Sequence, residues 1–246
     1  MAIKPKHFRP SRTAEIAFSK ALRTVARASG HLVETHVDGA ELEPGLVRAL
    51  IAYSDKLEPW ARRQSKKMLE TVAKSNRKAY VNKARITKQS KEIGKILNSS
   101  LSESGVDRVA GALMNEQVEL IKSLPLRAAT RAQRLAQTAV MEGTRASEIA
   151  EELARSGEVS ESSAALIART EVARANASIT QARAAALGAE AYIWRTTMDG
   201  AERDSHAKMN GKFVKYSEEP KLSDGTVGHA GTFPNCRCYQ DVQFED

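Results

Sequence analysis

Aromatic residues, cysteines and long apolar runs are all scarce in this 246-residue chain. Phe, Trp and Tyr make up 5% of the residues, and the remaining apolar residues are mostly Ala, Leu, Val and Ile. This composition suits packed helices better than a β-sandwich or barrel. No stretch approaches the roughly 18 consecutive apolar residues of a membrane span, and the N-terminus lacks the apolar core of a signal peptide. We therefore expect a mainly helical protein that is soluble, made in the cytoplasm and without a membrane partner.

Cysteine is limited to Cys236 and Cys238 near the C-terminus. Two cysteines separated by one residue cannot build a disulfide framework, and a bridge between them would be strained. The spacing therefore favours reduced thiols or metal ligands. A glycine-rich phosphate loop, a nucleophile elbow and a zinc-protease helix motif are also missing from the sequence. Their absence excludes the enzyme classes that such motifs define.

Positive charge is concentrated in the first third of the chain. Residues 1–91 carry 20 Lys and Arg against 8 Asp and Glu, whereas residues 92–246 carry 18 against 22. Such a basic segment suits contact with DNA phosphates or with an acidic protein surface, although a solvated helical face has the same pattern. Aromatic residues in this segment are too sparse to indicate base stacking. The candidate contact residues are Arg62, Arg63, Lys66, Lys67, Lys74, Arg77, Lys78, Lys83, Arg85, Lys88 and Lys91.

The first 159 residues are predicted to form a basic arm and a helical body. Pro5 and Pro10 favour an extended arm over residues 1–12, because neither proline favours a helix before it. Residues 13–159 then show apolar residues at helical spacing, with breaks expected at Gly30, Pro125 and Ser156-Gly157. The predicted helices of this basic body cover residues 14–29, 46–56, 60–98, 104–122, 125–141 and 145–155.

The last part of the chain, residues 160–246, is predicted to be a small α+β module. A long helix begins at Ser160, runs to Leu187 and ends at Gly188. β-Branched and aromatic residues then predict strands over residues 190–197, 212–216 and 238–244, with a helical piece at 202–209. Asn210-Gly211 is the strongest turn signal in the chain. The predicted fold is mainly α, a long helical N-terminal body with a small antiparallel sheet at the C-terminus.

Two further patterns concern possible chemistry in this module. Residues His206, His229, Cys236 and Cys238 offer the four nitrogen and sulfur ligands of a zinc site, although their spacing is not that of a standard finger. The alternative is that the histidine is hydrogen-bonded inside the fold and both thiols pack as small apolar groups. A thiol nucleophile with a histidine base would also be possible in principle.

On the predicted long helix, Glu171 and Arg174 share a face and can pair. An exposed pair of this kind contributes only about 0.3–0.5 kcal/mol, so the expectation from spacing alone is a solvated stripe.

Four segments occur in a characteristic order. These are Ile167-Ala168-Arg169-Thr170-Glu171, Tyr192-Ile193-Trp194-Arg195-Thr196-Thr197-Met198-Asp199, Arg203-x-x-His206-x-x-x-Asn210-Gly211 and Pro234-Asn235-Cys236-Arg237-Cys238. Together, over about residues 145–244, they resemble the phage Mu F-like family, the minor head or head morphogenesis proteins of tailed bacteriophages and prophages. Many relatives carry His just before the last segment, where this chain has Thr232-Phe233.

The resemblance implies a non-enzymatic minor capsid protein of the virion head. Such a protein would assemble in the host bacterial cytoplasm, bind the portal vertex and act in prohead assembly and in DNA packaging or exit. Its expected partners are the portal protein, a major capsid or scaffold protein and double-stranded DNA, with residues 13–159 as the portal- or capsid-binding body. The family pattern is carried by Arg169, Glu171, Trp194, Asp199, Arg203, His206, Asn210, Gly211, Asn235, Cys236 and Cys238.

In this family reading, Arg169 and Glu171 would anchor the sheet module on the long helix. Two other functions compete with a head protein: a zinc- or thiol-dependent effector enzyme, because the module also resembles domains fused to secreted toxins, and a non-specific DNA-binding protein.

Overall fold

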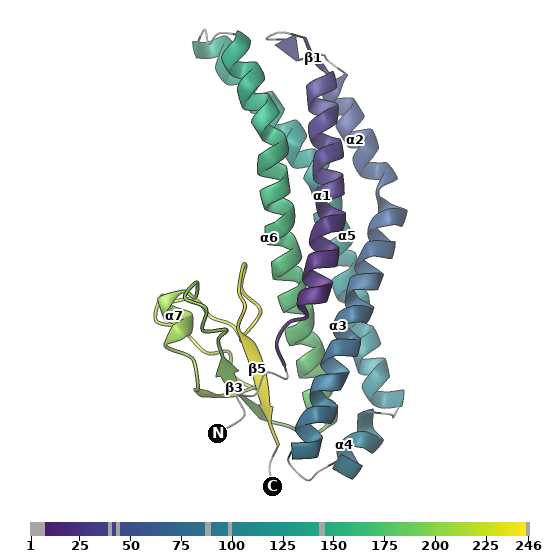
Figure 1. The fold of residues 1–246 in the computed structure, drawn as a ribbon, viewed down its shortest axis with the longest axis vertical. Coiled ribbons are helices and arrows are strands. Elements are labelled where there is room, and N and C mark those ends of the chain that lie inside the picture. Colours follow the sequence, from purple (N-terminus) through teal and green to yellow (C-terminus); the bar gives the residue numbers. More distant parts are fainter. Residues whose placement is uncertain are drawn as a thin grey trace. The chain divides into compact units, whose positions relative to one another are not determined.

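The computed structural model describes residues 8–38, 41–42, 45–86, 90–97, 100–142 and 146–244. As predicted, these residues are mainly helical and end in a small antiparallel sheet (Figure 1). The helices are α1 (Arg12–Thr35), α2 (Leu46–Lys56), α3 (Glu58–Ile86), α4 (Ser90–Leu97), α5 (Ser100–Glu142), α6 (Ala146–Ala186) and α7 (Asp204–Ala207). None of the helices described is long and apolar enough to cross a membrane.

The helices are longer than the breaks in the sequence predicted. Helix α1 passes through Gly30, α5 passes through Pro125, and α6 passes through Ser156-Gly157. The predicted ends at these residues are therefore wrong. A glycine inside a helix costs about 1 kcal/mol and a proline about 3 kcal/mol relative to alanine, and tertiary packing can offset such amounts.

Burial next to two of these residues supplies that packing. Val33 lies one turn beyond Gly30 and is fully buried in a cluster with Leu46 and Leu50. In α5, Leu124 is buried beside Pro125. Burying a side chain of this size contributes about 1.5–3 kcal/mol, which is enough to carry the helix past an unfavourable residue.

The described parts of the segment predicted as one helix over residues 60–98 are α3 and α4. Pro59 lies in the first turn of α3, where a missing backbone N–H costs little. Ile93 and Leu97 of α4 are buried in the same apolar cluster as Ala79 and Tyr80 of α3. Residues 87–89 lie outside the described part of the chain, so the continuity of the predicted helix stays a prediction.

Contacts divide the chain into two compact units. One consists of the described parts of Met1–Glu15, Lys67–Met114 and Arg169–Asp246, and the other of Ile16–Lys66 and Asn115–Ala168. The second unit has a core that joins α1, α2 and α5, with Ala129 and Ala132 allowing the helices to approach closely. The predicted domain limits at residues 12 and 159 stay predictions, and α6 runs across the second of them.

Phe8 belongs to the core of the first unit. Its ring meets Tyr80 edge to face with centroids 4.9 Å apart, and its carbonyl accepts a hydrogen bond from the Asn176 side chain at 2.9 Å. Residues 1–7 of the predicted basic arm lie outside the described part of the chain.

The sheet has the order β4-β3-β5 and is antiparallel throughout. Strand β3 (Ala191–Arg195) is central, between β4 (Phe213–Lys215) and β5 (Tyr239–Gln243), and Figure 1 shows β5 beside β3. These strands match the three predicted ones. A further pair of two-residue strands, β1 (Val37–Asp38) and β2 (Glu41–Leu42), follows α1. We call residues 189–244 the sheet module.

A candidate thiol and imidazole site

The residues that lead into the first cysteine form a tight turn. Pro234 and Asn235 occupy its two central positions, Asn235 has φ 57°, and the Cys236 N–H donates to the Phe233 carbonyl at 3.2 Å. Proline followed by a residue of positive φ is the signature of a type II turn, and Asn tolerates that conformation better than most residues. The turn fixes the direction in which Cys236 leaves the backbone.

Two residues of helix α6 contact this turn and hold it in place. The Asn235 N–H donates to the Thr170 hydroxyl at 2.9 Å, and the Arg169 guanidinium donates to the Asn235 side-chain oxygen at 2.8 Å. Arg203 donates to the Pro234 carbonyl at 2.9 Å from the other side. These contacts give Arg169, Arg203 and Asn235 a common role, which is to position the turn.

The imidazole of the site comes from α7, the short helix after β3. His206 lies in this helix with its side chain buried, and its ring meets Trp194 edge to face at 5.8 Å and Phe233 at 4.9 Å. The neighbouring Ser205 hydroxyl donates to the Asp224 carboxylate at 2.7 Å, which holds the helix against the loop that follows β4. The ring is thereby fixed between two aromatic side chains.

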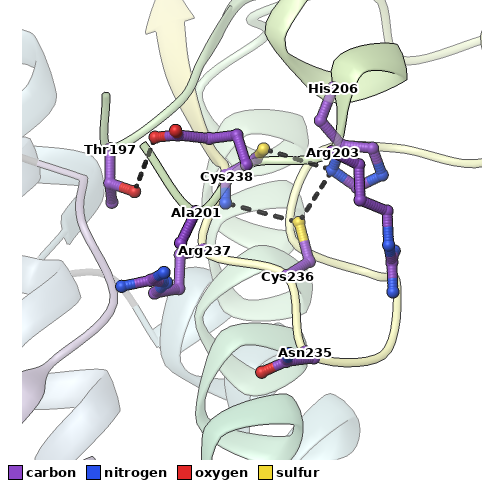
Figure 2. Close-up of a pocket in the computed structure, with 9 residues that line it drawn as sticks. Thr197, Ala201, Arg203, His206, Asn235, Cys236, Arg237 and Cys238 are labelled. Carbon is purple, nitrogen blue, oxygen red and sulfur yellow. Dashed lines mark hydrogen bonds between the residues drawn. The ribbon is translucent and has the colours of Figure 1, made fainter. Parts of the chain in front are cut away.

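His206, Cys236 and Cys238 form what we call the thiol–imidazole cluster (Figure 2). His206 Nδ1 lies 3.5 Å from the Cys236 sulfur and 3.4 Å from the Cys238 sulfur. The Cys238 N–H donates to the Cys236 sulfur at 3.3 Å. All three residues are 3% exposed and both thiols are free.

Because the two thiols lie close together, their pKa values shift in opposite directions. A hydrogen bond from the Cys238 thiol holds the pKa of Cys236 well below its ordinary value, with His206 acting in the same sense. The same bond, together with burial, raises the pKa of Cys238. Two such close acidic groups lose their protons in two steps that belong to the pair rather than to either sulfur alone.

The cluster lines a pocket of about 400 Å³, a volume that includes the space open to solvent. Arg203, Asn235 and Arg237 also line it, and Arg237 pairs with Asp199. The Glu202 carboxylate accepts bonds from the Thr197 hydroxyl and from the backbone of residues 199 and 200, at 2.8–3.2 Å. Both acidic groups near the pocket therefore already have partners.

A glycine brings the loop before the cysteines onto α6. Gly231 has φ 88°, and a Cβ there would lie 3.2 Å from the Ala177 Cβ and from the Cys238 carbonyl oxygen. Only glycine fits both the conformation and the space. The nearby Ala230 carbonyl accepts from the Gln240 side chain at 3.0 Å, which ties the loop to β5.

The second predicted histidine lies outside the cluster. His229 Nδ1 is 3.1 Å from the Tyr192 hydroxyl, which also accepts the N–H of Ala230. Burial lowers the pKa of His229, against the raising effects of Glu219 and of a backbone bond with Tyr216. The structure thus brings together three of the four predicted metal ligands and gives the fourth a different partner.

The remaining family-motif residues shape the module. Trp194 is fully buried, and its carbonyl accepts the Gly211 N–H at 2.8 Å. Asn210 accepts the Thr196 N–H at 3.0 Å through its side chain. Gly211 has φ 85°, as the predicted Asn-Gly turn requires.

Glu171 and Arg174 pair as their spacing predicts, at 3.0 Å, but not as a solvated stripe. The Glu171 side chain is 3% exposed, whereas that of Arg174 is 33% exposed. The spacing predicted the pair. The burial of Glu171, which only the structure shows, makes the pair a contact of the protein interior.

The basic residues of α3 are mostly on its surface. Those exposed are Arg62, Arg63, Lys66, Lys67, Lys74, Arg77, Lys78 and Arg85. Lys83 differs, because it pairs with the buried Asp241 at 3.1 Å. Lys91 lies in α4, and Lys88 lies outside the described residues.

Several positioning residues were missed by sequence reasoning. Thr170, Gly231 and Phe233 were not selected, although the Phe-Pro-Asn-Cys string is itself a type II turn signal that points to the turn. Nothing in the local sequence marks Gly231 or Thr170, because their partners lie on other elements.

These features define a helical protein whose last long helix carries a small sheet module with a buried thiol–imidazole cluster. Residues 131–240 match the family described as Phage Mu protein F like protein, the family that the motifs predicted. An uncharacterized protein of Haemophilus influenzae (strain ATCC 51907 / DSM 11121 / KW20 / Rd) is 32% identical over 129 residues. The match covers 52% of this chain and 28% of that protein, so the chain spans about a quarter of the relative's length. No solved structure matches the chain.

Proposed function

We propose that this chain is a minor capsid protein that acts in phage head morphogenesis at the portal vertex. The observation that carries the proposal is the family match over residues 131–240, which covers α6 and most of the sheet module. Membership of a phage head family points to head morphogenesis and to the virion as the location. Binding to the portal protein, to a major capsid or scaffold protein, and a part in DNA packaging or exit are the finer steps that we propose. We also propose that the chain is not an enzyme.

The design of the module supports an assembly role. Its signature residues mainly hold structure: Arg169, Arg203 and Asn235 fix a turn, while Trp194 and Gly211 fix the first connection of the sheet. A module built in this way offers a rigid surface to a partner and leaves the long helices available for other contacts.

Co-purification tests the assembly role directly. The full-length chain, produced together with the portal and capsid proteins of its own phage or prophage, should be recovered in proheads and should bind the isolated portal protein. A matched variant, Arg169→Ala, removes one of the two contacts between α6 and the turn, together with the ion pair to Glu15, and should weaken recovery if the module meets the partner. Proheads that lack the chain at every stage of assembly would refute the proposal.

The exposed basic face of α3 supports contact with packaged DNA as a second part of the proposal. Phosphate contacts make affinity fall linearly with the logarithm of salt concentration, with a slope of about −0.9 per contact. Lys74 and Lys78 are exposed, one helical turn apart, so Lys74→Glu with Lys78→Glu should reduce that slope by about two.

The matched control for the DNA test is Lys208→Glu with Lys212→Glu. It makes the same change in net charge on exposed residues of the sheet module. It should leave DNA affinity close to that of the unchanged protein. Equal losses of DNA affinity in both double variants would mean that total charge, rather than α3, determines binding. No measurable DNA binding at low salt would refute this part of the proposal.

A further inference from the structure

We propose that the thiol–imidazole cluster is a Zn²⁺ site with three protein ligands, His206 Nδ1 and the sulfurs of Cys236 and Cys238. This inference is independent of the proposed function in head assembly. The three ligand atoms lie within 4.8 Å of one another and are buried. One imidazole nitrogen and two thiolates match a known class of zinc site that keeps its fourth position for water or another ligand.

The distances fit a tetrahedral zinc ion. With zinc–sulfur bonds of about 2.3 Å and zinc–nitrogen bonds of about 2.0–2.1 Å, tetrahedral angles separate the sulfur and nitrogen ligands by about 3.5 Å. The observed separations from Nδ1 are 3.5 Å to Cys236 and 3.4 Å to Cys238. Both nitrogen–sulfur separations therefore already match those expected around a tetrahedral zinc ion.

The surroundings also match those of a metal–thiolate centre. The Cys238 N–H donates to the Cys236 sulfur, and bonds of this kind orient and stabilise a coordinating thiolate. Trp194 and Phe233 hold the imidazole ring in place, and the type II turn holds Cys236. Rigid ligands of this kind lose little freedom when a metal binds.

Charge favours zinc over the empty cluster. One Zn²⁺ with two thiolates and a neutral imidazole has no net charge, and a buried group is most stable when its charges are balanced. Without a cation, two thiolates buried beside a neutral imidazole would leave their negative charge unbalanced, which burial strongly disfavours.

The fourth position is open to the pocket rather than filled by His229. His229 Nδ1 is already bonded to the Tyr192 hydroxyl, and it lies outside the group of ligand atoms. The carboxylates of Glu202 and Asp199 are held by other partners near the pocket. All three ligand residues line that pocket, as Figure 2 shows, so water is the natural fourth ligand.

A zinc ion here would join two separate parts of the module, α7 and the segment that contains both cysteines. His206 belongs to α7, Cys236 ends the turn that α6 holds, and Cys238 immediately precedes β5. Because the two cysteines are 30 and 32 residues from the histidine, the metal would close a long loop. Its removal should therefore loosen the sheet module without unfolding the second unit.

Metal content of the full-length protein tests the proposal. The protein is purified under reducing conditions, loaded with Zn²⁺ and dialysed, and bound zinc is measured by elemental mass spectrometry. We expect one zinc per chain, and none in Cys236→Ser, Cys238→Ser or His206→Asn. The matched control, His229→Gln, changes a buried histidine of the same module and should keep its zinc. A zinc-free loaded protein, or loss of zinc in folded His229→Gln, would overturn the three-ligand site.

A measurement on the unchanged protein covers the case in which a ligand variant fails to fold. Co²⁺ replaces Zn²⁺ and gives a thiolate-to-cobalt charge-transfer band only when sulfur is a ligand. X-ray absorption of the zinc form should show two sulfur and two nitrogen or oxygen neighbours, with zinc–sulfur distances near 2.3 Å. Bound metal with no sulfur ligand, or with four nitrogen or oxygen ligands, would overturn the proposal even if the zinc count were one.

Discussion

Replacing Gly231 by alanine should destabilise the sheet module through two separable effects. The first is conformational, because φ is 88° and an L-residue in the left-handed region costs about 1–2 kcal/mol. The second is steric, because the new Cβ would lie 3.2 Å from the Ala177 Cβ and from the Cys238 carbonyl, and 3.4 Å from the Ala173 carbonyl. Two of these neighbours are backbone atoms that cannot rotate away, so overpacking should add about 1–3 kcal/mol.

Gly225→Ala separates the two effects. Gly225 has almost the same φ, 85°, but within the described residues nothing lies within 4 Å of a Cβ placed there. Gly225→Ala should therefore lower the free energy of unfolding by the conformational cost alone, about 1–2 kcal/mol. Gly231→Ala should lower the free energy of unfolding by that amount and by about 1–3 kcal/mol more. The difference between the two variants therefore measures how tightly the loop packs on α6.

Thermal unfolding and hydrogen exchange make this comparison. In a chain of this size about 1 kcal/mol lowers the Tm by roughly 2–4 °C, so the two variants should be resolved. Hydrogen exchange should show the faster opening in the sheet module, while amides around Val33 and Leu50 in the second unit keep their protection. Equal destabilisation by the two alanines would refute the close packing of Gly231 on α6.

Three further predictions concern buried polar groups. Glu171→Ala should cost about 1–3 kcal/mol through the lost bond to Arg174 and make the sheet module more protease-sensitive; unchanged resistance would contradict an anchoring role. Burial lowers the pKa of His229 from its ordinary 6.5, so the unfolded chain binds the proton at a higher pH than the folded chain does. The free energy of unfolding should therefore fall as the pH drops below about 6.5. The variant His229→Gln should make this fall smaller. Arg183→Met should cost about 3 kcal/mol in thermal unfolding, because it leaves the buried Asn76 oxygen without its donor, which lies 2.9 Å away, and removes a second bond to the Ala73 carbonyl. A neutral result would contradict this network.

Local chemistry was enough to predict most of the secondary structure. Alanine-rich segments with apolar residues at helical spacing form helices in the described part of the chain, and the run with aromatic and β-branched residues at Ala191–Arg195 forms a strand as expected. The order of the family motifs was equally local information, and it predicted the family that matches residues 131–240.

The ends of the helices were less predictable. Gly30 and Pro125 are unfavourable inside a helix. The free-energy cost of each is no larger than the stabilisation from burying one or two large side chains. Val33 and Leu124 supply such burial beside these residues. Whether a helix stops therefore depended on packing that comes from distant parts of the chain.

The candidate site shows the same division. The sequence by itself determined which side chains could serve, since His206, His229 and both cysteines were the available nitrogen and sulfur ligands. Only the tertiary structure decided which histidine joins the cysteines, because α7 brings His206 within 3.5 Å of both sulfurs while the Tyr192 hydroxyl takes His229. Spacing along the chain sets neither distance: His229 is nearer to the cysteines in sequence, but the fold of the loops places His206 beside them.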